Sequence, residues 1–442
     1  IDTAMERIGP DLILKGGNVV DVVSGRVIKA DVIIKDGIIC GVGSYSGENE
    51  QDVSGKYVMP GFIDSHVHIE SMTQPSEYAK AVMPHGITTV IADPHEITNV
   101  CGEDGLEFML KSAKNIPLDV NLMLPSCVPA TPFEHTGANL DAKTTQKLAP
   151  KFFGIGEMMN YPGIVSGDDE TLGKLCLDII DGHAPLLSGH ELDAYTSAGI
   201  KTDHECSVVE EMTEKISKGM YILLREGTLS LDVAKLIKGV TPYTLRRCAF
   251  CTDDRFVGEI IRDGSIDHCI RKAVSLGLNN IDAIIMATLN ACEMYGMKNK
   301  GAIAPSYVAD IVVADDLNLS SISQVYKNGK LVCENGTALF ECETVDNSKV
   351  TNTVHLPKIS ADFFKTDVKD KFDAIELIPE SIITKKVTVS YSDSLSKVCV
   401  IERHHNLGTK GIGFVTNYGI TNGAIATSIG HAPQAALADP AA

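Results

Sequence analysis

The chain has 442 residues, 44% of them hydrophobic and 22% charged, which is typical of a globular protein with room for two or three domains. Its net charge of −19, from 39 basic and 58 acidic residues, argues against nucleic acid or an anionic membrane as partner and favours a small neutral or cationic substrate. No apolar run could span a bilayer, and no export signal opens the sequence. The twelve scattered cysteines are typical of reduced thiols, so we expect a cytoplasmic protein.

The first 60 residues predict short β-strands joined by tight turns. Alternating apolar segments lie at 11–14, 18–22, 30–34 and 38–42. Turn signals such as Asp36-Gly37 separate them, and the same pattern returns at 309–313 and 324–332. We therefore expect a small β-sandwich domain built from both flanks of a longer middle region, residues 1–60 plus 304–345.

The middle region, residues 61–303, alternates between strand-like and helix-like segments. Strand candidates lie at 61–68, 87–92, 119–124, 152–157, 179–183, 200–204, 221–225 and 247–253. Eight alternations predict an α/β fold, a TIM-like (β/α)8 barrel with its active site at the C-terminal ends of the strands. The interval 171–180 is short, which indicates either a clipped helix or skipped residues. Cys248-x-x-Cys251 is a single pair in a buried strand, so we expect packing and not a zinc knuckle.

Residues 346–442 predict a further β-rich C-terminal domain, with apolar strand candidates at 386–390 and 398–401. The last residues, 432–442, have the composition of a low-complexity tail.

Two histidines, His66 and His68, end the first strand of the predicted barrel. Side chains at i and i+2 of a strand point to one face, so both imidazoles can bind one metal ion. Alone, such a pair is more often two surface histidines near a turn than a metal site. Other predicted barrel strands also end in potential ligands, namely Glu157, His183, His204 and Asp253. Together these six residues predict a centre for one or two divalent ions, which the two oxygens of Glu157 could bridge.

A bound divalent ion lowers the pKa of its water from about 15.7 to near 7 and so makes a nucleophile available at neutral pH. We expect Asp253 to take the proton of that water and to return it to the leaving group.

The segments that carry these residues resemble the amidohydrolase superfamily, whose opening signature matches residues 59–68. Within it, the chain is similar to the bacterial adenine deaminase family over residues 11 to about 430. The matching segments are Gly61–Ser71, Ala92–Ile97, Gly154–Asn160, Asp181–Pro185, Asp203–Cys206, Arg225–Gly227 and Cys251–Arg255. The combination of G-E-M-M-N, D-G-H-A-P and T-D-D-R is specific to the family, whereas H-x-H marks the superfamily alone.

The resemblance implies hydrolysis of adenine to hypoxanthine and ammonia, a purine-salvage reaction, at two divalent ions, manganese or iron. It assigns His66 and His68 to the first ion, His183 and His204 to the second, and Glu157 to the position between them. Attack would occur at C6 of adenine, with Asp253 passing a proton to the departing amino group. A ring nitrogen must also gain a proton, for which Glu157, Glu205 and Glu96 are open candidates.

Several nearby residues could support the site. His95 and Glu96 follow the second barrel strand, where a turn with a helix cap is the alternative to a direct role. Arg225 ends the seventh strand and could bind substrate or form an internal ion pair. Asp254 should point away from Asp253 into a structural salt bridge, with Arg255 as a possible partner.

Two other functions fit parts of the sequence. A dihydroorotase-like or hydantoinase-like cyclic amidohydrolase would be expected to carry lysine where Glu157 stands. A non-catalytic scaffold with this fold would be expected to have lost ligands, yet every ligand position is filled.

The family resemblance also bears on the C-terminus and on assembly. Family members carry a His-Asp-Ser-His-Asn segment of which His431 alone remains here, so we expect a truncated C-terminal domain whose loss could affect activity. We further expect a homo-oligomer, a dimer or larger, that acts on small-molecule adenine without nucleic acid or membrane.

Overall fold

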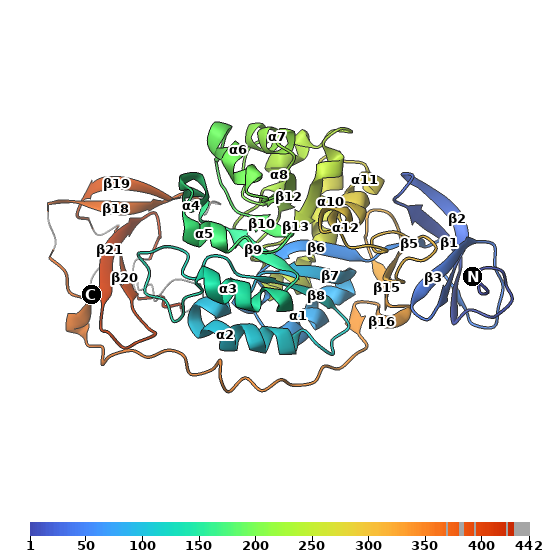
Figure 1. Cartoon of the computed structure of the whole chain (residues 1–442), viewed down its shortest axis with the longest axis horizontal. Helices are drawn as coiled ribbons and strands as arrows, with labels where there is room; N and C mark the ends of the chain where they lie inside the picture. Colours follow the sequence, from blue (N-terminus) through green and yellow to red (C-terminus); the bar gives the residue numbers. More distant parts are fainter. Residues whose placement is uncertain (368–369, 380–383, 393–394, 421–422, 428–442) are drawn as a thin grey trace.

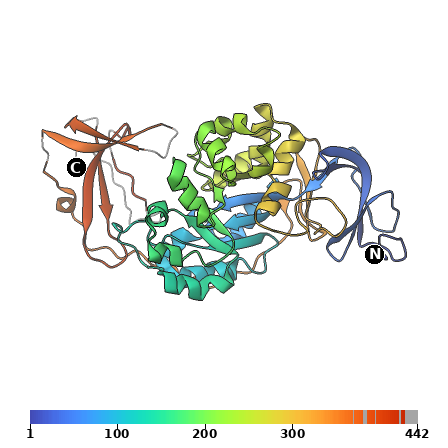
Figure 2. The same cartoon turned by 45° about the horizontal axis from the view of Figure 1, so that its top comes forward.

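The computed structural model describes residues 1–442 except 368–369, 380–383, 393–394, 421–422 and 428–442. His431 and the tail therefore lie outside the described residues. Three parts follow one another along the long axis, with a β-sheet domain at each end and an α/β barrel between them (Figures 1 and 2). Within the described residues, no helix combines the length and the apolar character that a membrane span requires.

The N-terminal domain is one nine-stranded sheet drawn from both flanks of the barrel. Its strands are β1 (Leu12–Asp21), β2 (Arg26–Lys35), β3 (Ile38–Gly43), β4 (Glu50–Asp52), β5 (Tyr57–Pro60), β14 (Ile311–Ala314), β15 (Ile322–Lys327), β16 (Lys330–Glu334) and β17 (Thr337–Ala338). β5 and β14 join the two flanks as an antiparallel pair, with Pro60 opposite Ile311. Alternate apolar residues of these strands, such as Val32 and Val58, form the domain's own core.

Eight parallel strands form the barrel, as the sequence predicts. They are β6 (Phe62–Val67), β7 (Ile87–Ala92), β8 (Asp119–Leu124), β9 (Gly154–Met158), β10 (Ile180–Gly182), β11 (Thr202–Asp203), β12 (Tyr221–Arg225) and β13 (Cys248–Cys251). The ring closes where the Asp253 N–H donates to His66 O at 2.9 Å and Val67 bridges Asp253. Asp64 also accepts bonds from Thr252 N and Oγ1, at 3.0 and 2.5 Å. These contacts bring the ends of β6 and β13 together.

Helices surround the barrel. They are α1 (Pro75–Val82), α2 (His95–Ser112), α3 (Ala142–Leu148), α4 (Tyr161–Ser166), α5 (Asp169–Gly173), α6 (Gly189–Ser197), α7 (Val209–Ser217), α8 (Val233–Leu236), α9 (Val257–Asp263), α10 (Ile266–Ser275), α11 (Asn280–Met286) and α12 (Leu289–Met294). The short interval before β10 holds only the five-residue α5, which fits either a clipped helix or skipped residues. Cys248 and Cys251 are buried in β13, where they pack into two different apolar clusters, as the packing interpretation predicts.

The C-terminal domain is a four-stranded sheet in the order β19-β18-β21-β20, from β18 (Lys371–Leu377), β19 (Thr384–Ser390), β20 (Ser396–Ile401) and β21 (Lys410–Thr416). The segment before it runs along the barrel from the N-terminal sheet (Figure 1). Lys349 of this segment lies 2.7 Å from Asp104 of α2. The loop after β20 contacts the barrel through His405 Nε2, 3.0 Å from Thr136 O.

Candidate metal centre

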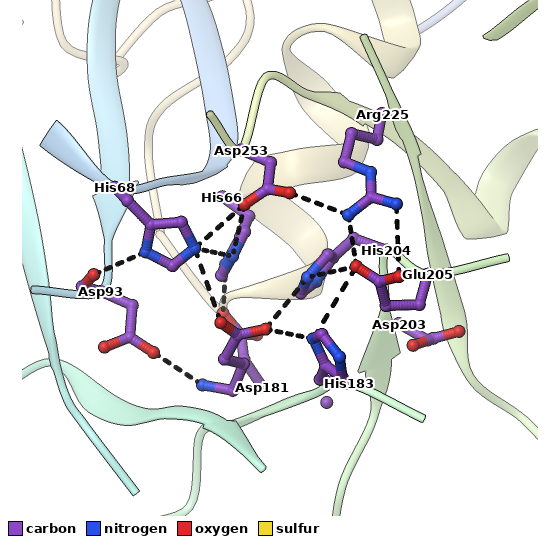
Figure 3. Close-up of polar contacts among 12 residues, drawn as sticks. His66, His68, Asp93, Asp181, His183, Asp203, His204, Glu205, Arg225 and Asp253 are labelled. Carbon is purple, nitrogen blue, oxygen red and sulfur yellow. Dashed lines mark hydrogen bonds and ion pairs between the residues drawn. The ribbon is translucent and has the colours of Figure 1, made fainter. Parts of the chain in front are cut away.

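The strand ends bring the six predicted residues together at one end of the barrel (Figure 3). Five of them line one pocket, and the fully buried His66 lies beside these five. His66 Nε2 lies 3.1 Å from His68 Nε2, as the i, i+2 spacing on β6 predicts. The His204 ring stacks on His66 with centroids 4.1 Å apart, and the His183 ring meets His204 edge-on at 5.3 Å. Four imidazoles from β6 and from the ends of β10 and β11 thus converge.

Glu157, the fourth residue of β9, lies among these rings. Its Oε2 is 2.6 Å from His183 Nδ1 and 3.0 Å from His204 Nε2, and its Oε1 is 3.5 Å from His68 Nε2. One carboxylate therefore contacts both halves of the predicted ligand set. Burial would raise the pKa of Glu157, but the charge and hydrogen bond of His183, with hydrogen bonds from His204 and His95, hold it well below the usual range.

Asp253 follows β13 with a left-handed backbone, φ 55°, a conformation that Asp tolerates better than most residues. This backbone aims its carboxylate at the centre, with Oδ1 3.0 Å from His68 Nε2 and Oδ2 2.8 Å from Arg225 Nη1. Burial opposes ionisation, yet the hydrogen bond from His68 and the charge of Arg225 hold the pKa of Asp253 well below its usual range. Asp253 is therefore ionised at neutral pH.

Backbone and neighbouring side chains orient the ligand candidates. The carbonyl of Asp93 lies 2.8 Å from His68 Nδ1, which leaves His68 Nε2 to face the centre. The Asp93 carboxylate accepts the Glu157 N–H at 2.9 Å, and a Cβ at Gly156 would collide with that carboxylate. The Tyr195 hydroxyl accepts the His183 N–H at 2.9 Å. The first contact fixes the His68 ring, and the other two fix the backbone that carries Glu157 and His183.

Arg225, at the end of β12, is held by three carboxylates. Figure 3 shows two of them, those of Glu205 and Asp253. It contacts both oxygens of Glu205, with Nη2 3.3 Å from Oε2, and lies 3.3 Å from Asp232 Oδ2 in addition to its contact with Asp253. Arg225 thus forms the internal ion pair that the sequence left open, and it also lines the pocket.

His95 and Glu96 begin α2 and also line the pocket. The His95 ring stacks on His68 at 4.2 Å, with Nδ1 3.2 Å from Glu157 Oε1 and Nε2 3.5 Å from Glu96 Oε1. Both residues therefore adjoin the ligand candidates. The prediction for Asp254 is wrong, because Asp254 lines the pocket while Arg255 donates to the carbonyls of Gly264 and Glu226, at 3.0 and 3.1 Å.

The donor set fits divalent transition ions. Ligand atoms about 2.0–2.2 Å from one ion lie roughly 3–4 Å from each other. The ligand atoms of His66, His68 and Glu157 lie within 4.8 Å of one another, as do those of Glu157, His183 and His204. The pocket also favours positive charge, because carboxylates overcome burial and raise the pKa of His183 to about 9. Imidazole nitrogen combined with carboxylate oxygen suits iron, manganese or zinc.

A cavity of about 330 Å³ opens onto this cluster, at the small end of ligand pockets. Its apolar lining comes from Met72, Met159, Leu229 and Phe256, none of which the sequence analysis identified as site residues. Leu229 and Phe256 are 63% and 53% exposed, although both are large and apolar. Leu229 follows β12 and Phe256 follows β13. This position just after a barrel strand is the signal that could have identified them.

Barrel, strand-end ligands and flanking β-domain together define a metal-dependent amidohydrolase. The family model described as "Amidohydrolase family" matches residues 57–332, and the chain belongs to that family. A second model, "Adenine deaminase C-terminal domain", matches residues 377–437. The chain is therefore a member of the adenine deaminase branch, as the relatives described next also show.

Adenine deaminase of Clostridium acetobutylicum is 47% identical over 98% of this chain and 79% of its own length. The corresponding protein of Halalkalibacterium halodurans is 43% identical over 95% of this chain and 76% of its own length. Among solved structures, an enamidase superposes with a TM-score of 0.55 at 18% identity, covering 75% of this chain and 99% of its own. At that identity the likeness concerns the fold alone.

Proposed function

We propose that this protein hydrolyses adenine to hypoxanthine and ammonia. The main support is the 47% identity to an adenine deaminase over nearly the whole chain. Glu157, at the fourth strand of the barrel, also supports the proposal. Its carboxylate contacts four imidazoles, those of His68, His95, His183 and His204.

Two divalent ions, manganese or iron, are the proposed cofactors. His66 and His68 would hold one, His183 and His204 the other, and Glu157 would lie between them. Ions bound there would make a water molecule nucleophilic near neutral pH.

Asp253 is the proposed proton carrier, since it is ionised and its Oδ1 faces the ligand cluster. It would accept a proton on that oxygen and deliver it to the departing amino group. Its other oxygen is bound by Arg225, which restricts rotation of the carboxylate. The same arginine fixes Glu205, so both acidic groups keep one orientation.

The remaining pocket residues are proposed to bind the flat purine. Met72, Met159, Leu229 and Phe256 supply apolar surface for its faces. The Ser71 hydroxyl lies in the pocket lining and has no hydrogen-bond partner within the described part of the chain. Together with Glu96 it would bond to the nitrogen edge of the ring, with the Glu96 carboxylate accepting a ring N–H.

Metal analysis combined with an ultraviolet assay tests this proposal. Purified protein should contain divalent metal and convert adenine to hypoxanthine, with dihydroorotate and hydantoin left unchanged. Metal with ring-amide cleavage but no adenine turnover would favour the cyclic amidohydrolase. Absence of metal and of both activities would favour the scaffold.

Two further proposals concern the state of the protein. We infer a reducing compartment such as the cytoplasm, which the twelve free cysteines support. We also propose a homo-oligomer. Light scattering at micromolar concentration should give the mass of at least two chains, and the mass of one chain would contradict the proposal.

A further inference from the structure

A buried lysine joins the two chain segments that carry His183 and His204. Lys215 of α7 is 0% exposed, and its Nζ donates to Asp203 Oδ2 at 2.6 Å and to Ala184 O at 2.7 Å. Asp203 immediately precedes His204, and Ala184 immediately follows His183. Lys215 is not among the residues that line the pocket. Its position thus points to a role behind the ligand candidates and not to contact with substrate.

The contacts of Lys215 close into a ring with the backbone. The Ala184 N–H donates to Asp203 Oδ1 at 3.1 Å, while the other oxygen of this carboxylate accepts from Lys215. Lys215 in turn donates to the carbonyl of the same alanine. Both polar backbone groups of Ala184 are therefore bound to one ion pair. The ring fixes the chain just after His183 relative to the chain just before His204.

Glu211, also on α7, accepts the remaining proton of the Lys215 ammonium. Its Oε1 lies 2.7 Å from Lys215 Nζ and accepts the Leu186 N–H at 2.7 Å. All three donors of the ammonium thus have an acceptor. Leu186 has a left-handed backbone, φ 61°, which is uncommon for a large apolar residue. The bond to Glu211 therefore holds the turn that follows His183.

The same acidic side chains could suggest a further metal site. Ligand atoms of Asp203, Cys206 and Glu211 lie within 4.8 Å of one another. Both carboxylates, however, already bind the Lys215 ammonium at 2.6 and 2.7 Å. A side-chain cation therefore occupies this position, and the group serves to hold the backbone.

We propose that Lys215 is a positioning residue that holds His183 and His204 at the spacing required to bind one divalent ion together. The clamp that does so comprises Lys215, Asp203, Glu211 and Ala184. Loss of contacts outside a metal's own ligands typically lowers metal affinity about 10- to 100-fold. The inference rests on the two-ion centre of the proposed function for its effect on metal binding, and on the hydrogen bonds alone for the clamp.

The effect should be confined to one of the two ions. His66 lies in β6 and His68 directly follows this strand, where the carbonyl of Asp93 orients its ring. These contacts involve no member of the clamp. Removal of Lys215 should therefore weaken the ion held by His183 and His204 and spare the other.

Titration of the metal-depleted chain with Mn²⁺, followed by calorimetry, tests this selectivity. In Lys215→Met one Kd should rise about 10- to 100-fold and the other should change less than about threefold. The site that His183→Ala removes should be the weakened one. Adenine turnover of Lys215→Met should recover in excess Mn²⁺. Unchanged binding, or equal weakening of both sites, would overturn the proposal.

The matched control is Lys218→Met at the end of the same helix. It removes an ion pair with Asp193, 2.6 Å long and nearer the surface, and should leave both Kd values unchanged. If Lys215→Met does not fold, Asp203→Asn takes its place, because it keeps an oxygen for the Ala184 N–H and leaves Lys215 bound to Glu211. The same Kd should then rise by about threefold or more, and an unchanged value would overturn the proposal.

Hydrogen–deuterium exchange without metal reports on the clamp itself. Peptides that cover residues 183–187 should exchange about tenfold faster in Lys215→Met than in wild type or Lys218→Met, because Lys215 holds the acceptors of the Ala184 and Leu186 N–H groups in place. Unchanged exchange there would contradict the clamp. A wild-type chain that binds no Mn²⁺ would refute the proposed metal centre alone, since exchange still tests the clamp.

Discussion

Two buried clusters of charged residues lie at opposite ends of the barrel and differ in composition. At the N-terminal end, Lys300 and Lys327 bind Asp119 and Asp310, so two cations meet two anions. At the C-terminal end, Arg225 is the one permanent cation among the described residues that line the pocket, against five carboxylates. The lysines and aspartates of the N-terminal cluster balance one another in charge, whereas the carboxylates of the C-terminal cluster require additional positive charge. The first therefore joins domains and the second binds ions.

The largest expected effect comes from removing the carboxylate at the centre of the ligand cluster. Glu157→Gln should lower kcat/KM at least about 10³-fold and reduce bound metal, since an amide is a weaker ligand and carries no charge. Metal content and the adenine assay measure both. Glu107→Gln, in an exposed ion pair with Lys111, is the control and should behave as wild type. A metal-replete, active Glu157→Gln would contradict the assignment.

Breaking the N-terminal cluster should affect stability instead. Lys327 is 4% exposed and lies 2.8 and 2.7 Å from Asp119 and Asp310. Lys327→Met should lower the free energy of unfolding by about 3 kcal/mol, the lower end for a broken buried pair because Asp119 is partly exposed. Urea unfolding measures the change, with exposed Lys330→Met as control. Folded Lys327→Met should retain its kcat/KM, and a large loss of activity would show that the two clusters are not independent.

Arg225 tests whether geometry matters as well as charge. Arg225→Lys keeps the charge but loses the planar fork that binds Glu205, Asp232 and Asp253 together. We expect kcat to fall about 10- to 100-fold with metal content preserved. Arg246→Lys at an exposed site should have no effect. Wild-type kcat in Arg225→Lys would mean that the positive charge alone suffices.

The smallest expected effect is a pH dependence of the stability that the N-terminal cluster contributes. Burial opposes ionisation of Asp119, but the charges of Lys300 and Lys327 hold its pKa below the usual value. A lowered folded-state pKa stabilises the protein above the unfolded pKa, about 3.9, and this gain is lost as the pH falls. The stability difference between wild type and Lys327→Met should therefore be constant from pH 7 to 5 and shrink toward pH 3. Urea unfolding across that range checks it, and a difference that grows on acidification would contradict it.

The barrel and its ligand cluster could be predicted because parallel strands buried on both faces give continuous apolar runs. Against such a run, a polar residue at the strand end, such as His68 or Glu157, is conspicuous. The ligand candidates lie at the C-terminal ends of several barrel strands, with His66 and His68 sharing β6, so topology alone brings them together.

Other parts of the site depend on side-chain geometry or on distant segments. The ion pairs of Arg225 follow from where Glu205 and Asp232 project, which no local pattern encodes. Asp254 was assigned to the wrong side because the left-handed backbone of Asp253 breaks strand alternation.

The pairing of β5 with β14 has a consequence for biosynthesis. As the chain leaves the ribosome, β1 to β5 emerge first. One edge of β5 stays unpaired until residues 311–314, which form β14, have been synthesised. Through that interval the nascent polypeptide carries an open sheet edge, a template for pairing with other chains. Translation speed across the barrel segment should thus govern how much newly made protein aggregates.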